Sequence, residues 1–158
     1  MDSRMSSSNK TNSRIASNRK ALHDYFVVEK FEAGIVLRGS EVKSIRDGHV
    51  SLVGSYARIE NDEVILHGVD IPPYSHGGHY NHVADRPRKL LLHRREIRKL
   101  RASIERLGQT LIPLSMYFKR GNVKIDLGLC KGKQLHDKRE TMRRKTADRD
   151  AARAMGRV

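Results

Sequence analysis

Apolar and polar positions alternate over much of the chain, which is the pattern of half-buried strands. Residues 25–38 are rich in β-branched and aromatic side chains and indicate two strands or one strongly bent strand. Two more strand-like runs follow at 50–60 and 63–71. Asn61 and Asp62 lie between them, and this pair is typical of a hairpin turn. The first half of the chain therefore predicts an antiparallel meander.

Two segments instead space their apolar residues as helices do. In the first, near 40–47, Ser40 can cap the start and Gly48 can end the helix. The second, near 90–107, ends before Gly108 and has one apolar face. That face is formed by Ile97, Leu100, Ile104 and Leu107. The opposite face is basic and can meet either solvent or phosphate; it carries Arg94, Arg95, Arg98, Lys99, Arg101 and Arg106.

A second hairpin completes the predicted core. Residues 111–118 and 123–129 indicate its strands, and residues 119–122 its turn. The pattern then gives five to seven short strands with two inserted helices. A mainly β chain of this kind folds most economically as a small OB-like antiparallel β-barrel, which we expect over residues 18–130. Such barrels commonly bind oligonucleotides on an outer face, although fold alone does not establish function.

The charge distribution indicates a polyanionic partner. The 158 residues carry a net charge of +14 and a pI near 10.3, which favours nucleic acid or an anionic membrane. Residues 1–20 hold +4 of this charge and residues 131–158 hold +6. Residues 1–17 are poor in large apolar groups and rich in Ser and Asn, so we expect a disordered N-terminal arm there.

The last segment, residues 131–158, combines good helix formers with ten basic and four acidic side chains. Met142 and Met155 are nearly its only large apolar groups, so no apolar stripe can dock it on the core. We expect this basic tail to be disordered when free and helical when an anionic surface neutralises it. With Asp137 placed to cap its start, a helix to Met155 would be roughly 28 Å long. A solvated terminus that aids solubility is the alternative.

Several other classes of protein are disfavoured. No apolar run is long enough to span a bilayer and no secretory signal is present, so we expect a cytoplasmic protein without a membrane partner. Cys130 is the single cysteine and indicates a small buried residue at a strand end. Motifs of serine hydrolases, phosphate-binding loops and zinc proteases are absent, so no catalytic residue and no cofactor are expected.

A glycine-rich loop over residues 74–87 contains His76, His79 and His82. Their spacing is compatible with a zinc site, but no Cys, Asp or Glu completes a tetrahedral set at a recognisable spacing. A loop that contacts RNA is the preferred interpretation, and no metal is expected. A metal-dependent nuclease using these histidines is kept as a hypothesis; it predicts RNA cleavage that chelation abolishes.

Three runs of the sequence together resemble a known family. They are residues 18–46, which include Phe31-Glu-Ala-Gly34, then Arg88-Lys-Leu-Leu-Leu-His93, and finally Lys131-Gly-Lys133 with His136-Asp-Lys-Arg139. In this order and spacing they closely resemble the SsrA-binding proteins, also called small protein B, from about Asn18 to the C-terminus. The N-terminal arm and the histidine loop lie outside these motifs.

The resemblance implies a non-enzymatic RNA-binding adaptor with an OB-like barrel. Family members bind the tRNA-like domain of transfer-messenger RNA and deliver it to stalled ribosomes in trans-translation, which rescues the ribosome and tags the incomplete protein. Elongation factor Tu is implied as a further partner in the delivery complex. On this chain, Glu32, Leu91 and His93 fall where the family carries residues important for RNA binding. Some members have Asn at the position of His93, and both side chains can hydrogen-bond.

For the tail, the resemblance implies a hinge at Gly132 and entry into the decoding centre and empty mRNA channel of the small ribosomal subunit. His136 can stack on an unpaired base, and the cations can bind phosphate without sequence choice. A general nucleic-acid-binding chaperone is the alternative function, because charge alone would suffice for it. The tail residues expected at the ribosome are Lys131, Gly132, Lys133, His136, Asp137, Lys138, Arg139, Arg143, Arg144 and Lys145.

Overall fold

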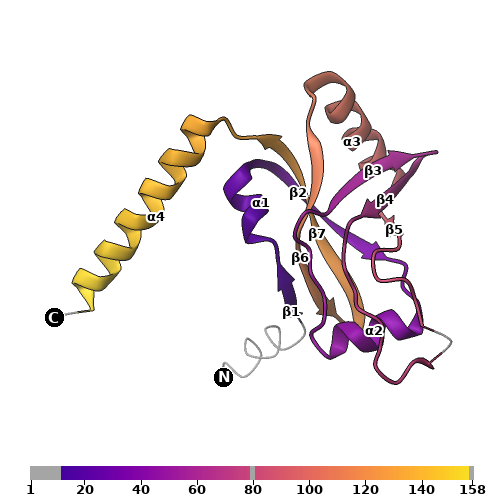
Figure 1. Cartoon of the computed structure of the whole chain (residues 1–158). Coiled ribbons are helices and arrows are strands. Elements are labelled where there is room, and N and C mark those ends of the chain that lie inside the picture. Colours follow the sequence, from indigo (N-terminus) through magenta and orange to yellow (C-terminus); the bar gives the residue numbers. More distant parts are fainter. Residues whose placement is uncertain (1–11, 79–80, 157–158) are drawn as a thin grey trace, which may run out of the picture.

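The computed structural model of the chain describes residues 12–78 and 81–156 (Figure 1). Its strands are β1 (Asn12–Ser17), β2 (Tyr25–Ile35), β3 (Tyr56–Glu60), β4 (Glu63–His67), β5 (Arg88–Leu91), β6 (Thr110–Lys119) and β7 (Asn122–Gly132). Its helices are α1 (Arg19–Asp24), α2 (Gly39–Arg46), α3 (Arg94–Leu107) and α4 (Leu135–Met155). Figure 1 shows a body of strands with α2 and α3 at opposite ends, and α4 projecting away from it.

The strands form one antiparallel sheet that closes on itself. Over the described residues the strand order is β1-β6-β3-β4-β5-β2-β7, and β7 pairs again with β6. β7 lies at the centre of this closure, because it pairs with β2 from Lys124 to Gly132 and with β6 from Asn122 to Cys130. The expected mainly β fold with a small antiparallel barrel is confirmed.

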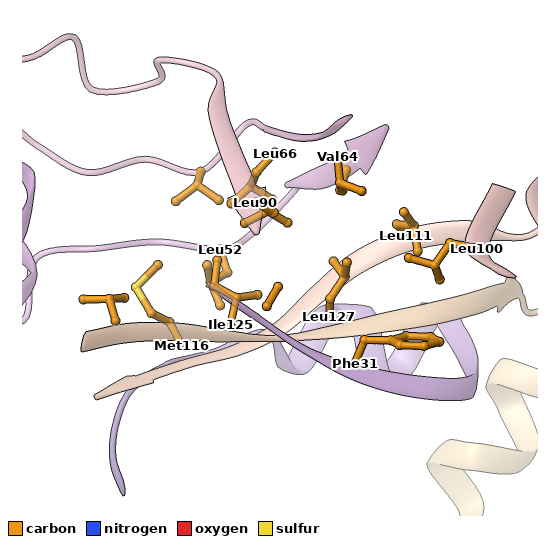
Figure 2. Packing of buried hydrophobic residues seen from close by; sticks show 14 of the residues in the cluster. Phe31, Leu52, Val64, Leu66, Leu90, Leu100, Leu111, Met116, Ile125 and Leu127 are labelled. Carbon is orange, nitrogen blue, oxygen red and sulfur yellow. The ribbon is translucent and has the colours of Figure 1, made fainter. Parts of the chain in front are cut away.

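Strand alternation places the apolar core inside this ring. Val123, Ile125, Leu127 and Leu129 of β7 are all buried, as their spacing predicts. Figure 2 shows the side chains of Leu66 and Leu90 facing Ile125 and Leu127 across the interior. The sheet thus has a filled inner face, which leaves its outer face for other contacts.

Both predicted hairpins are present, and the two central residues of each turn have positive φ. Asn61 and Asp62 have φ of 50° and 62°, and Arg120 and Gly121 have φ of 51° and 79°. A tight two-residue hairpin turn of this kind needs positive φ at both central positions, which Asn, Asp and Gly tolerate best. These turns set the registers of β3 with β4 and of β6 with β7.

The prediction of a disordered arm is wrong for Asn12–Ser17, which form β1; residues 1–11 lie outside the described residues. β1 pairs with β6 from Ser115 to Lys119, the half of β6 that β3 does not cover. Main-chain hydrogen bonds to an open strand edge do not require large apolar side chains, so composition misjudged this segment. Asn18 then anchors it, because its buried amide donates to the carbonyls of Leu52 and Pro113 at 3.2 and 3.0 Å.

The predicted helix near 90–107 begins later than expected. Arg88–Leu91 form β5, with Arg88 and Leu90 buried and Lys89 and Leu91 exposed, and α3 starts only at Arg94. The run of three leucines fits either a strand or a helix. In the structure it begins in a strand, because residues 88–90 pair with β4. The helix predicted near 40–47 is confirmed as α2, although Arg38 rather than Ser40 occupies its cap position.

A buried ion cluster holds α2 against the barrel. The side chain of Glu41 is fully buried and accepts hydrogen bonds from Arg86 and Arg88, and from the backbone N–H of Arg38 at 2.8 Å. Burial alone would raise the pKa of Glu41, but these donors together lower it below its ordinary value. Glu41 therefore stays ionised inside the protein.

Arg88 extends this cluster into the long connection between β4 and β5. Only 1% of Arg88 is exposed, and its guanidinium donates to the carbonyls of Val69 and Ala84 at 2.9 Å each. Each of the three guanidinium nitrogens thus has a partner, as a buried charge requires. The cluster joins α2, β5 and the connection that carries the histidine loop.

We predict that Glu41→Gln lowers the free energy of unfolding by about 3–5 kcal/mol, because it leaves the buried Arg88 without its counter-charge. Denaturant unfolding measures the change. Glu60→Gln is the matched control, because Glu60 is partly exposed and pairs with His67 and Arg58 at the surface; its cost should stay below about 1 kcal/mol. Equal costs in the two variants would contradict this role of Glu41.

Wild type and Glu41→Gln also test how the contribution of Glu41 to stability depends on pH. A lowered folded-state pKa contributes stability above the ordinary carboxyl pKa of 4.5, and this contribution is lost as the pH falls through the folded-state value. The difference in unfolding free energy between wild type and Glu41→Gln should therefore shrink as the pH is lowered below about 4.5. A difference that is constant down to pH 2 would contradict the lowered pKa.

Candidate nucleic-acid interface

Glu32 lies on the outer face of the barrel, on β2. Its neighbours Phe31 and Ala33 are buried, whereas Glu32 is exposed. Its carboxylate accepts hydrogen bonds from the hydroxyl of Tyr117 at 2.5 Å and from Nζ of Lys119 at 3.0 and 3.2 Å. Both donors belong to β6, so the carboxylate reaches across β7, which lies between β2 and β6. An exposed side chain is thereby held in one orientation.

These donors make Glu32 a fixed negative charge. The hydrogen bonds from Tyr117 and Lys119 lower the pKa of Glu32 below its ordinary value. In return, burial and the adjacent carboxylate raise the pKa of Tyr117, so its hydroxyl keeps the proton that it donates. An ionised carboxylate retains lone pairs that can accept from a base edge or a 2′-hydroxyl group.

Leu91 lies on the same outer face, on β5. It is 52% exposed and stands opposite Gly34, which is two residues from Glu32 along β2. Residues two apart on a strand, and residues opposite each other on paired strands, point to the same face. A Cβ atom at position 34 would lie 3.3 Å from the Cβ of Leu91, so the glycine gives the leucine its space. Leu91 therefore presents an apolar surface on the same outer face as Glu32, on the strand at the other side of β2 from β7.

His93 follows two residues after Leu91 and is the N-cap of α3. Its backbone N–H donates to Oε1 of Glu96 at 3.1 Å, and its carbonyl accepts from the N–H of Ile97 at 3.0 Å. The backbone of His93 is thus fixed while its side chain is exposed. The structure brings Glu32, Leu91 and His93 to two paired strands and the adjoining helix start.

Sequence reasoning missed Tyr117 and Lys119, the two residues that orient Glu32. Alternation along residues 111–118 gives the face of Tyr117, but it does not tell which strand lies beyond the neighbouring one. The contact depends on β7 lying between β2 and β6, where Asp126 pairs with both Glu32 and Ser115. Only the sheet order reveals that an acid at position 32 meets donors more than 80 residues later.

The base of the tail is attached to α1 and to the start of β2. The backbone N–H of Lys133 donates to the carbonyl of Asp24 at 2.9 Å, and its Nζ donates to Leu22 and Thr141 at 3.2 and 2.9 Å. Lys138 pairs with the carboxylate of Asp24 at 3.3 Å. Two of the predicted ribosome-contacting cations therefore have partners within the chain.

The rest of the tail is a helix with its predicted residues displayed to solvent. Arg139, Arg143, Arg144 and Lys145 are exposed, and His136 forms a surface pair with Glu140 at 3.3 Å. Asp137 is not the cap: Gln134 occupies that position, and Asp137 accepts from its N–H at 3.3 Å. That the free tail is disordered stays a prediction. Met142 and Met155 are exposed, and no residue of α4 is buried among those whose side chains are described.

Lys131 and Gly132 belong to β7 rather than to the helix. They pair with Phe26 and Tyr25 of β2, and Lys131 is exposed. A Cβ atom at Gly132 would have no heavy atom within 4 Å, and its φ is not in the left-handed region. Neither space nor backbone angle requires glycine here, so a role for Gly132 would rest on flexibility.

One of the three histidines of the loop is not at the surface. His82 is buried, with Nδ1 2.8 Å from Oγ of Ser40 and Nε2 2.7 Å from the carbonyl of Ile71, so it serves the fold and not RNA contact. His76 is exposed, and His79 lies outside the described residues. Within residues 12–78 and 81–156, no three His, Cys, Asp or Glu side chains are grouped as metal ligands.

The expectation for the single cysteine is confirmed. Cys130 is fully buried, which raises the pKa of its thiol to about 11. It is a packing residue at the end of a strand, as predicted. In the part of the chain that the structure describes, no helix combines the length and apolar character needed to cross a bilayer.

Comparison with known proteins places this geometry in a family. The SmpB protein family matches residues 15–157. The SsrA-binding protein of Geobacillus thermodenitrificans (strain NG80-2) is 54% identical over 140 residues, which cover 89% of this chain and 90% of that protein. The SsrA-binding protein of Geobacter sulfurreducens is 51% identical over 141 residues, covering 89% of this chain and 92% of its own.

A solved structure agrees with these sequence relationships. A chain from the work described as "tmRNA-SmpB: a journey to the center of the bacterial ribosome" is 47% identical and has a TM-score of 0.64. The alignment covers 82% of this chain and 94% of that one. The family match over residues 15–157 includes the strands that carry Glu32 and Leu91 as well as most of the tail. Together with the related sequences and the solved structure, it shows that the chain belongs to the SmpB protein family.

Proposed function

We propose that this protein is a non-enzymatic adaptor that binds the tRNA-like domain of transfer-messenger RNA and delivers it to stalled ribosomes in the bacterial cytoplasm. The names of the relatives and of the solved structure support RNA and the ribosome as partners. Elongation factor Tu is proposed as a further component of the delivery complex. In this role the ribosome is rescued and the incomplete protein receives its tag.

The oriented carboxylate of Glu32 is the observation that carries the proposal. Charge alone would attract any RNA, but a carboxylate repels phosphate and can only help where it meets a base edge or a sugar hydroxyl. Glu32 is held by Tyr117 and Lys119, and the same outer face carries an exposed leucine, Leu91, which can pack on a base or ribose. Such a pairing favours a particular RNA shape over RNA in general.

We propose a separate role for the tail. Its exposed cations would bind ribosomal RNA phosphates in the decoding centre and in an empty mRNA channel, and His136 would stack on an unpaired base. Message and tail cannot occupy the channel together, so the tail would report that the channel is empty. Bending at Gly132 would let it enter, with loss of the contacts of Lys133 and Lys138 to α1.

Equilibrium binding across a salt series tests the proposal against a general nucleic-acid chaperone. Transfer-messenger RNA is compared with an unrelated structured RNA of equal length. Contacts beyond counterion release should keep the affinity for transfer-messenger RNA higher at every salt concentration, most clearly at high salt. Curves that fall together would identify a chaperone-like basic binder. Cleavage of either RNA that chelation abolishes would instead support the nuclease.

Tyr117→Phe tests the orientation of Glu32. Loss of one donor should raise the pKa of Glu32 towards its ordinary value and weaken binding to the tRNA-like domain about three- to tenfold. The pKa is read from the carboxyl carbon by NMR, and the affinity by fluorescence anisotropy. Tyr56→Phe is the control, because Tyr56 is an exposed tyrosine on β3.

A double-variant comparison separates this role from a direct contact of Tyr117 with RNA. If Tyr117 acts through Glu32, Tyr117→Phe should add little to the loss already caused by Glu32→Ala. Additive losses would show that the hydroxyl acts on the RNA by itself. Unchanged affinity in Glu32→Ala, with the fold intact, would remove Glu32 from the interface.

Truncation after Gln134 tests the division between barrel and tail. This end point keeps β7 complete and retains the contact of Lys133 with Asp24. The truncated protein should prefer transfer-messenger RNA over the matched RNA by the same ratio as the full chain, although both affinities fall at low salt. Tagging on stalled ribosomes should be lost. A lost preference would contradict the proposed division.

A further inference from the structure

A groove lies at the end of the barrel that carries α3. It is bounded by the turn of the β3–β4 hairpin, by β5 and by one face of α3, and has a volume of about 590 Å³. Figure 1 shows these elements gathered at the end opposite to α2. Leu91 lines the groove, so it begins at the interface already described.

The groove is basic, and its charges divide into two kinds. On one side Arg101 pairs with Asp62, and Lys89 pairs with Glu63 at 3.0 Å, so the acids of the hairpin neutralise these cations. Arg94 and Arg98 also line the groove, and both are exposed. Among the described residues, no carboxylate lies within ion-pair distance of either one.

Arg94 and Arg98 are placed to act together. They are four residues apart on α3, which puts them on the same face of the helix. They also line a second hollow, of about 680 Å³, together with His93, Arg95 and Glu96. The two guanidinium groups therefore form a ridge between two depressions, and His93 of the interface adjoins it.

We propose that this ridge and groove bind the phosphate backbone of the RNA, as a continuation of the contacts made by Glu32, Leu91 and His93. The proposal rests on the function proposed above. A guanidinium group donates to phosphate oxygens in a bidentate way, and two of them one helical turn apart can hold successive phosphates. The partly exposed Leu92 and Ile97 give the groove an apolar part for the sugars between those phosphates.

The arrangement gives the two surfaces different tasks. Phosphate contacts fix position and add affinity without reading sequence, whereas the carboxylate of Glu32 discriminates against poorly shaped RNA. Since Arg98 is fixed on a helix whose Leu100 is buried in the core, the ridge is presented rigidly relative to β2. The position of the phosphates then determines which group reaches Glu32.

The double variant Arg94→Gln/Arg98→Gln tests this proposal. Its control, Lys43→Gln/Arg46→Gln, removes two exposed cations from α2 at the opposite end of the barrel. Affinity for the tRNA-like domain of transfer-messenger RNA is measured across a salt series. The α3 variant should lose about tenfold or more in affinity and flatten the slope of log K against log salt by about one to two. The α2 variant should change far less in both.

Phosphate ethylation interference supplies a second readout. Ethyl groups that block binding of the wild-type chain at the ridge should lose their effect in the α3 variant and keep it in the α2 variant. Circular dichroism should show both variants folded, because none of the four side chains is buried.

The outcomes separate this inference from the proposed function. If the wild-type chain prefers transfer-messenger RNA while the α3 and α2 variants lose affinity equally, the ridge is not a phosphate site and the proposed function stands. If the wild-type chain itself shows no preference over the matched RNA, the proposed function fails. Unchanged ethylation interference in the α3 variant would also overturn the inference.

Discussion

The pairing of β7 with both β2 and β6 is the constraint on which the rest of the structure depends. It closes the sheet, buries the alternating apolar residues of β7 and sets the distance from β2 to β6. The carboxylate of Glu32 meets Tyr117 and Lys119 only because a single strand separates them. The end of β7 also fixes where the tail leaves the barrel. The strand pairings that close the barrel therefore also position the residues of the proposed interface.

The α2 end of the barrel and the tail are stabilised by different interactions. Around Glu41 and Arg88, full burial makes each hydrogen bond necessary, and the cluster holds its parts together in one arrangement. The tail has no buried face and only a few polar contacts at its base. Unfolding and refolding of its helix therefore cost little free energy, which suits a segment proposed to enter a charged channel. Rigidity and adaptability are thus kept in separate parts of the chain.

Much of the fold followed from local patterns. The hairpins at 61–62 and 120–121, the helix near 40–47 and the barrel itself were predictable, because alternation and turn chemistry are encoded within short windows. β1 was not predictable, because it is stabilised by pairing with an open edge of β6, and no residue near β1 in the sequence indicates that edge. The leucines of β5 also misled, since a short apolar run fits both a strand and a helix.

The candidate site shows the same limit. Glu32, Leu91 and His93 were placed through resemblance to a family, and the structure puts them on two paired strands and at the adjoining start of α3. Tyr117 and Lys119 could not be found in this way, because their role depends on sheet order. His82 was misread as a surface residue, since a histidine in a glycine-rich loop gives no local sign of the buried carbonyl that it meets.

NMR mapping of the full chain tests the central claim most directly, namely that one face of the barrel recognises RNA while the tail acts elsewhere. ¹⁵N-labelled protein would be titrated with the tRNA-like domain of transfer-messenger RNA at physiological salt. The account predicts shifts around Glu32, Leu91, His93 and the start of α3, with α2 unaffected and α4 changed little. Shifts concentrated in α4, with the outer face of β2 and β5 unchanged, would contradict it.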